Sequence, residues 1–350
     1  MDLERYQFRH LHPLVFLGTA SDRYAGWLGQ IYTPELYRGR IQRRTKRLAQ
    51  MEFVEELLPV ESVREYFRHF RVLELDFTFY SPLLDRDGAP TANLRLLELY
   101  RTHLGREDLV LLKAPQAVTA QRLRTAQGFL SNPNYLSPEL FTKGFYEPAS
   151  EILGHHLAGI ILEQEYQPKA ERRDPEKVAQ ELERFFRAIP RDARYQLELR
   201  TRQYLTESVF QVMESHGVGQ VLSHWTWLPS LRRQLAASGG RFLKRGRACL
   251  IRLMTPLGVR YEEAYARAHP FDGMVEGMLQ PGMVEETARI MCSGVKAGAE
   301  LYVIVNNRAG GNAPQIAKMV AQRFLELMGV DFGKALMGEG KEAGSDEALG

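Results

Sequence analysis

Short runs of apolar and β-branched residues recur along the chain, and a stretch with helical spacing follows each of them. Runs this dense in apolar residues are typical of parallel strands that helices cover on the outside. We count eight of them. The predicted strands are residues 15–19, 72–80, 109–113, 158–164, 195–200, 218–223, 248–254 and 301–306.

The intervening segments have the period and the boundaries of helices. Residues 174–188 begin with Asp174 and Pro175, a capping residue followed by a proline at the first helical position. Residues 205–216 and 282–297 place apolar side chains at helical spacing, and each is followed by a glycine. These patterns predict helices between the strands.

Alternation of strand and helix implies parallel strands joined by right-handed crossovers. Eight such units favour an α/β protein with one closed (β/α)8 barrel, a TIM barrel, over an open doubly wound sheet. No Gly-x-Gly-x-x-Gly motif follows the first strand, so no nucleotide cofactor is expected. Longer insertions are expected in the loops that follow strands, at residues 21–59, 116–151 and 255–281.

The chain of 350 residues is long enough for one barrel of about 250 residues that carries insertions. We expect one domain over residues 1–332. Residues 333–350 are rich in Gly, Glu and Lys, and we expect them to form a disordered tail because they have little apolar surface to bury.

Composition favours a cytoplasmic protein. Cys249 and Cys292 lack metal-ligand spacing and are interpreted as buried, reduced thiols. The charged N-terminus has no apolar segment of a secretory signal. No apolar run approaches the roughly 18 residues that span a bilayer, so no membrane partner is expected.

Charged and amide side chains stand at the ends of most predicted strands. In a parallel barrel these ends meet at one face, where chemistry gathers. Glu74 and Asp76 alternate with Leu73 and Leu75, so both carboxylates are expected to point into the barrel. The other strand-end residues are Lys113, Glu163, Gln164, Glu165, Glu198, Arg200, Arg202, His224, Arg252, Asn306 and Asn307.

Charges inside a barrel are costly unless they are paired or used. Glu74 and Glu198 could form a self-neutralising network with Lys113, Arg200 and Arg252. Alternatively, these cations could bind an anionic ligand, with Glu74 or Glu198 as general acid or base. One divalent cation could be held by Glu74, Asp76 and Glu198, although no residue is assigned as a metal ligand.

The turn after the last strand, residues 306–314, adds a separate indication. Gly310 and Gly311 would let the backbone approach a ligand closely, while Asn312 can cap the next helix and Pro314 fits its first turn. Such a helix N-terminus can bind phosphate at this position of a barrel. An ordinary tight turn is the alternative.

Several motifs occur in an order that resembles a known family. Gly18-Thr19 with Tyr24, Trp27 and Tyr32 is similar to Gly-Thr-Ser-Gly-Trp-x-Tyr-x-x-Trp, and residues 74–80 are similar to Glu-Ile-Asn-x-Thr-Phe-Tyr. Lys113-Ala114-Pro115 is similar to Lys-x-Pro, and Asn306-Asn307 with residues 310–313 is similar to a closing Asn-Asn motif. Over roughly residues 16–320 the chain resembles the YecE-like family of uncharacterised TIM-barrel proteins.

The resemblance implies the barrel fold and a set of site positions, but no established reaction. The ligand-binding positions that we assign are Lys113, Gln164, Arg200, Arg252, Asn306, Asn307, Trp27, Tyr80 and Gly310. The chain departs from the family pattern at Ala20-Ser21-Asp22, where the family has Ser-Gly-Trp, and at Met254 and Arg308, where it has His and Asp. These departures indicate a divergent member whose ligand differs.

Three functions stay open, and whether the protein is an enzyme stays open with them. The first is binding or processing of a phosphate-bearing or other anionic ligand at the C-terminal face of the barrel. The second is binding of nucleic acid or endonuclease-like processing of phosphodiesters, in which the basic stretches 38–47 and 241–247 would grip the backbone. A non-catalytic scaffold is the third, and solvated charge is the alternative for both basic stretches.

Overall fold

Eight parallel strands close into a barrel in the computed structural model, which describes residues 2–48, 50–125 and 128–329. The predicted TIM barrel is therefore confirmed, whereas the predicted tail 333–350 lies outside the described residues. Around the barrel the strands follow the order β1 (Val15–Ala20), β12 (Glu300–Val305), β11 (Ala248–Leu253), β10 (Gly219–His224), β9 (Tyr195–Leu199), β8 (Leu157–Gln164), β5 (Leu109–Lys113) and β4 (Val72–Leu75).

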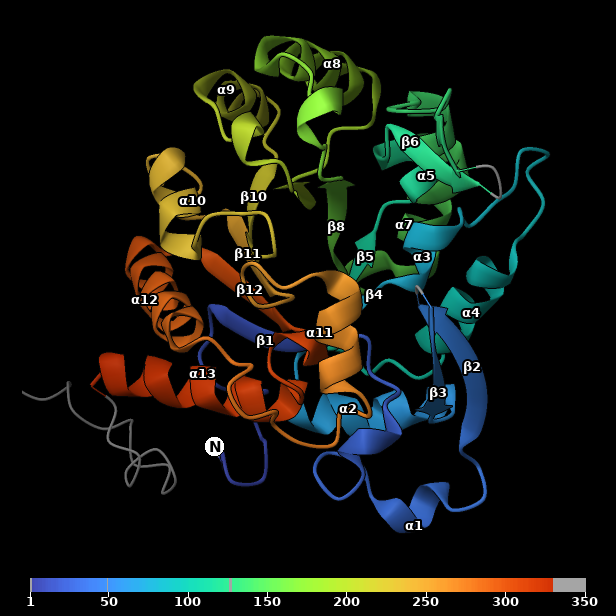
Figure 1. Cartoon of the computed structure of the whole chain (residues 1–350), viewed down its shortest axis with the longest axis vertical. Coiled ribbons are helices and arrows are strands. Elements are labelled where there is room, and N and C mark those ends of the chain that lie inside the picture. The colour runs from blue at the N-terminus through green and yellow to red at the C-terminus, as the bar shows by residue number, and fades with distance from the viewer. Residues whose placement is uncertain (1, 49, 126–127, 330–350) are drawn as a thin grey trace, which may run out of the picture.

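Helices surround the strands, as Figure 1 shows, and each predicted helix is present within one or two residues of its expected ends. Asp174 caps its helix by accepting a hydrogen bond from the backbone N–H of Glu176. The main helices, in chain order, are α2 (Val63–His69), α4 (Ala92–Arg101), α7 (Glu147–Leu153), α8 (Pro175–Ala188), α9 (Glu207–Ser215), α10 (Leu231–Ala237), α12 (Pro281–Ala297) and α13 (Ala313–Leu327).

The three expected insertions lie where the sequence predicts them. The first contains the short α1 (Pro34–Tyr37) and a hairpin of β2 (Gln42–Leu48) and β3 (Met51–Leu57), which lies outside the barrel (Figure 1). The second contains α5 (Gln116–Thr119), the hairpin β6 (Arg122–Thr125) and β7 (Gly128–Ser131), and α6 (Pro138–Phe141). The third contains α11 (Tyr261–Ala268).

The second predicted strand, 72–80, is too long. Strand β4 ends at Leu75, and the aromatic segment forms the short helix α3 (Phe77–Tyr80). The Thr78 hydroxyl donates to the carbonyl of Lys113 at 2.7 Å, and the Asn93 amide donates to the carbonyl of Phe77 at 3.0 Å. These long-range contacts outweigh the strand preference of the aromatic and β-branched side chains.

The interior of the barrel has two chemically distinct layers. An apolar layer contains Phe16 and Tyr302, whose rings stack with centroids 4.7 Å apart, together with Val72, Leu111 and Leu250. Inward side chains alternate along each strand, so the next inward position on β4 is Glu74 and on β11 is Arg252. A charged layer therefore lies above the apolar one, at the C-terminal ends of the strands.

Close approach of β1 and β4 predicts a strong effect of adding one methyl group at Gly18. A Cβ there would lie 2.0 Å from the backbone oxygen of Val72, which is its partner in the strand register. We expect Gly18→Ala to lower the free energy of unfolding by about 1–3 kcal/mol, measured by urea denaturation. Gly273→Ala is the control, because no described atom beyond its two chain neighbours lies within 4 Å of its added Cβ. An effect at Gly18 within about 0.5 kcal/mol of the control would contradict the close approach.

Candidate functional site

Six charged side chains form the upper layer of the barrel interior, and we call them the lumen cluster. Three are carboxylates and three are cations, so their formal charges cancel. No side chain among them is more than 11% exposed. They are Glu74 on β4, Lys113 on β5, Glu163 on β8, Glu198 on β9, Arg200 just after β9, and Arg252 on β11.

Arg252 joins the two deepest carboxylates. Its Nε donates to Glu74 Oε2 at 2.8 Å, its Nη2 donates to Glu74 Oε1 at 2.5 Å, and its Nη1 donates to Glu198. Burial alone would raise the pKa of Glu198, but Arg200 and Arg252 outweigh burial and lower that pKa to about 2. Glu74 and Glu198, predicted as acid–base residues, are instead fully buried and share the Arg252 guanidinium, and Glu198 also accepts from Arg200 Nε at 3.1 Å.

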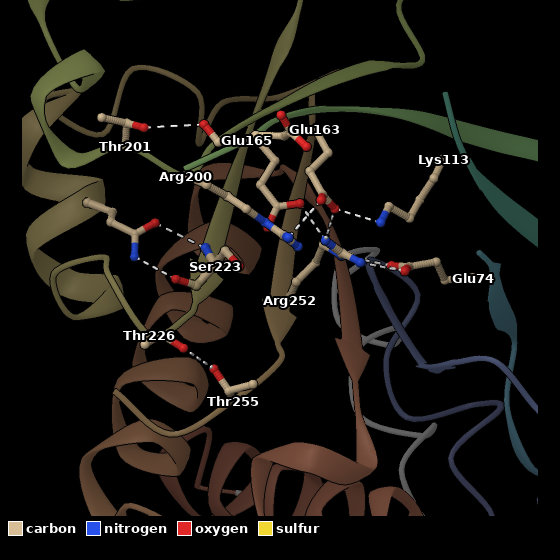
Figure 2. Close-up of polar contacts among 12 residues, drawn as sticks. Glu74, Lys113, Glu163, Glu165, Arg200, Thr201, Ser223, Thr226, Arg252 and Thr255 are labelled. Atoms are coloured by element: carbon tan, nitrogen blue, oxygen red, sulfur yellow. Dashed lines mark hydrogen bonds and ion pairs between the residues drawn. The ribbon is translucent and has the colours of Figure 1, made fainter. Parts of the chain in front are cut away.

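Glu163 is the carboxylate on which the cations converge (Figure 2). Lys113 Nζ lies 2.6 Å from Glu163 Oε2, Arg200 Nη1 lies 2.6 Å from Oε1, and Arg252 Nη1 lies 3.5 Å from Oε2. Burial disfavours its charge, but Arg200 and Lys113 outweigh burial and lower the pKa of Glu163. Because Glu163 and Glu198 are register partners on adjacent strands, only cations between them can offset their repulsion.

A pocket of about 610 Å³ opens beside the lumen cluster, and we call it the Glu165 pocket. Arg200 lines it, with its guanidinium carbon 4.4 Å from the centre of the Trp225 ring. The indole N–H of Trp225 is buried and has no hydrogen-bond partner among the described residues. The lining residues include Phe79, Gln121, Arg122, Phe129, Glu163, Glu165, Tyr166, Glu171, Arg173, Arg200 and Trp225.

Glu165 differs from every member of the lumen cluster, because its carboxyl group forms no hydrogen bond or ion pair with any other described residue. Burial, followed by the negative charge of Glu163, raises the pKa of Glu165 to about 7. Glu163 and Glu165 thus share a pocket while their environments move their pKa values in opposite directions. Sequence reasoning noted both residues but gave neither a role, although their i, i+2 spacing could have indicated a shared face.

Four of the predicted ligand-binding residues make hydrogen bonds within the protein and do not line the Glu165 pocket. Gln164 accepts a hydrogen bond from the Tyr135 hydroxyl at 2.7 Å. Trp27 is buried and donates to the Asn307 side chain at 3.2 Å, while Asn306 accepts from the backbone N–H of Arg308. These contacts hold β8, the first insertion and the last turn in place.

The predicted anion site at the start of α13 is closed, so this expectation is corrected. Asn312 accepts from the backbone N–H of Gln315 at 3.0 Å, and Asn307 accepts from that of Ala313 at 2.8 Å. A Cβ at Gly311 would lie 2.4 Å from the carbonyl of Gly273, and the carbonyl of Gly310 accepts from Val275. The glycines therefore let the chain approach its own third insertion, and side chains already cap the helix.

The carboxylates do not gather as metal ligands. Glu74 and Glu198 both bind Arg252, whereas Asp76 follows β4 and accepts from the Ser21 hydroxyl at 3.0 Å. Within residues 2–48, 50–125 and 128–329, no group of three or more His, Cys, Asp or Glu side chains could hold a metal ion. The residues that would have held a divalent cation are thus separated.

Most cations of the two basic stretches are paired with carboxylates. Residues 42–47 of the first stretch belong to strand β2, and their cations face glutamates across the hairpin, as in Arg43 with Glu56 at 2.8 Å. In the second, Arg241 binds Glu207 at 2.6 Å and Lys244 binds Glu214 at 2.8 Å. This pairing reduces the charge that either stretch offers to a polyanion.

No described helix is long and apolar enough to cross a membrane.

The lumen cluster predicts that Arg252 is far more important for stability than a surface arginine. We expect Arg252→Met to lower the free energy of unfolding by about 3–5 kcal/mol at pH 7, because Glu74 and Glu198 would lose their shared cation. Urea denaturation at pH 7 measures this loss, with the exposed Arg267→Met as control. Equal losses for the two variants would contradict the assignment.

Comparison with known proteins agrees with this architecture. The family model described as "Protein of unknown function DUF72" matches residues 16–334. The structure of a DUF72 family protein from Thermotoga maritima MSB8 is 15% identical, with 89% of this chain and 99% of that chain covered and a TM-score of 0.56. A DUF72 family protein from Enterococcus faecalis V583 is 12% identical, with 89% of this chain and 95% of that chain covered and a TM-score of 0.53. At these identities the likeness shows the fold alone. No curated protein matches the sequence. Because the family model spans most of its length, the chain belongs to the DUF72 family of proteins of unknown function.

Proposed function

We propose that this protein binds a small anionic ligand of the phosphate-ester class in the Glu165 pocket and transfers a proton to or from it. The observation that carries the proposal is the pair Glu163 and Glu165, which line one pocket with pKa values moved in opposite directions. Two carboxyl groups separated in this way are the usual arrangement for acid–base chemistry near neutral pH.

The pocket offers arginine side chains to an anion. Arg122, Arg173 and Arg200 line it, and two of them already have other partners, since Arg122 binds Glu171 and Arg173 binds Glu181 at 2.6 Å. Arg200 is the best placed of the three cations. Glu163, Glu198 and the Trp225 ring hold its guanidinium in position before any ligand arrives. A cation that is already oriented loses little entropy on binding.

The two glutamates have different roles in the proposal. Glu163 stays ionised because Lys113 and Arg200 surround it, so it positions these cations rather than exchanging a proton. Glu165 carries the exchangeable proton, since its pKa lies near neutral pH and its carboxyl group faces the pocket. Glu74 and Glu198 support the site from below through Arg252.

The structure offers less support for the other two hypotheses. A nucleic-acid partner would need free cations on the basic stretches, but most of these cations are paired with glutamates, which weakens their attraction for a polyanion. An inert scaffold would have no reason to keep Glu165 half-buried and unpaired, because such a group opposes folding above its pKa. We therefore favour the small anionic ligand.

Ligand binding should raise the unfolding temperature, and Arg200 should be required for this effect. We expect inorganic phosphate or a sugar phosphate, present at 100 times its dissociation constant, to add about 2.7 kcal/mol and raise the midpoint by a few degrees. Arg200→Ala should abolish the shift. The exposed neighbour Arg202→Ala should preserve it and serves as the control. A shift seen only with oligonucleotides would favour the nucleic-acid hypothesis, and no shift with any anion would favour the scaffold.

The proton of Glu165 can be tested without knowing the ligand. A carboxyl ¹³C titration should show one resonance with a midpoint near pH 7, and Glu165→Gln should remove it. Folding raises this pKa, so protonation favours the folded state, and stability should fall as pH rises from about 4.5 through 7. Glu165→Gln should reduce this fall, most clearly between about pH 6 and 7, whereas the exposed Glu176→Gln should not. A midpoint near 4.5 for Glu165 would rule out its role as proton donor.

A further inference from the structure

A second pocket, of about 220 Å³, lies at the mouth of the barrel above β1 and β4. Helix α3 separates it from the Glu165 pocket, because Phe79 lines the Glu165 pocket and Tyr80 lines this one. Tyr80, which the sequence suggested as a ligand contact, is 64% exposed at its rim. We call this space the Asp22 pocket after its most buried acidic residue.

Asp22 lines the pocket, and one of its carboxylate oxygens has no hydrogen-bond partner among the described residues. The residue is only 1% exposed, and its Oδ1 accepts a hydrogen bond from the Tyr100 hydroxyl at 2.8 Å. Its Oδ2 is buried and receives no hydrogen bond from any described residue. A buried carboxylate oxygen without a donor is costly, so this atom calls for a donor from outside the chain.

The backbone before Asp22 fixes its position. Ser21 has a φ of +65°, in the left-handed region that side chains other than glycine rarely adopt. Its N–H donates to the carbonyl of Glu74 at 2.9 Å, and its carbonyl accepts from the Thr19 hydroxyl at 2.7 Å. Strain of this kind persists only where the surrounding contacts determine it.

Asp76 brings a second carboxylate to the same pocket. It accepts from the Ser21 hydroxyl at 3.0 Å, and its negative charge adds to burial in raising the pKa of Asp22 to about 6. Among the described residues, no ion pair joins either Asp22 or Asp76 to a cation. Two neighbouring carboxylates without a counterion form a site for a positive charge.

Four cations also line the pocket, each with another partner, and Glu55, which binds two of them, is itself a lining residue. Arg44 and Lys46 bind Glu55 at 2.6 and 3.0 Å. Arg23 donates to the carbonyl of Leu58, and the Arg308 guanidinium carbon lies 4.4 Å above the Tyr261 ring. None of them neutralises the two aspartates by direct contact.

Tyrosine rings form much of the remaining wall. They are Tyr24, Tyr80, Tyr100, Tyr261 and Tyr265. Aromatic faces attract organic cations, and a carboxylate beside them supplies the opposite charge. At about 30 Å³ per water molecule, the space is large enough for about seven waters, and thus for a small ligand rather than a macromolecule.

We propose that the Asp22 pocket binds the primary ammonium group of a small organic cation. The ammonium group would donate to Asp22 Oδ2 and to Asp76, and the tyrosine rings would enclose its carbon skeleton. Three N–H donors suit two carboxylates that have no other cation. This site is separate from the Glu165 pocket and does not depend on the function proposed for it.

Isothermal calorimetry on the full chain at pH 8, where Asp22 is ionised, tests the proposal. The probes are ethylammonium chloride, its neutral analogue ethanol, and glycine, whose carboxylate tests a further contact with Arg308. We expect saturable binding of ethylammonium and none of ethanol. Asp22→Asn keeps the shape of the side chain and should weaken ethylammonium binding by about tenfold or more, because a charged hydrogen bond is lost. Asp272→Asn changes the net charge equally on an exposed residue outside the pocket and should leave the affinity unchanged.

Two further measurements keep the outcome decisive. Asp76→Asn, at a half-buried position, should also weaken ethylammonium binding and covers the case in which Asp22→Asn fails to fold. Phosphate-induced stabilisation should survive in both variants, so loss of the ammonium site can be told apart from loss of the Glu165 pocket. Absence of ethylammonium binding by the wild-type chain, or equal binding by wild type, Asp22→Asn and Asp76→Asn, would overturn the proposal.

Discussion

The guanidinium of Arg252 is the interaction on which the upper half of the barrel depends. Three carboxylates point into a lumen from which water is largely excluded, and Glu163 and Glu198 are neighbours in the strand register. Without a central cation their repulsion would force the strands apart or force the carboxyl groups to take up protons. Arg252 binds Glu74 through two nitrogens and Glu198 through the third, and it thereby fixes β4, β9 and β11 relative to one another.

The same network prepares the mouth of the barrel. Glu163 holds Lys113 and Arg200 at fixed positions, so the cation facing the Glu165 pocket is oriented by the fold rather than by a ligand. Phe79 lies below the Lys113 ammonium at 3.7 Å, which further restricts that side chain. The side chains of Lys113 and Arg200 are therefore held in place where an anion would bind. Glu165 is left as the group that can change its charge.

Charged groups on the outer surface of the protein form ion pairs, whereas two carboxyl groups at the barrel mouth do not. On the β2–β3 hairpin and along α9, exposed arginines and lysines meet glutamates, as Arg43 meets Glu56 and Lys244 meets Glu214. At the barrel mouth, in contrast, the buried Asp22 and the half-buried Glu165 have carboxyl groups that no cation contacts in an ion pair among the described residues. Two departures from the family pattern, Asp22 and Arg308, also line the mouth, so sequence divergence and unpaired charge coincide there.

Local patterns in the sequence determined the barrel, since apolar runs and helical periods depend on neighbours close in the chain. They also placed Glu74, Lys113, Glu198, Arg200 and Arg252 at the strand ends, because the period of a strand is enough to do so. Only the tertiary structure decided which charges pair, because the partners come from strands far apart in sequence. It also turned the aromatic end of the second predicted strand into α3 and closed the glycine turn against the third insertion. The free energy of an ionised side chain depends on which charges and how much protein surround it, and the linear chain does not specify that environment.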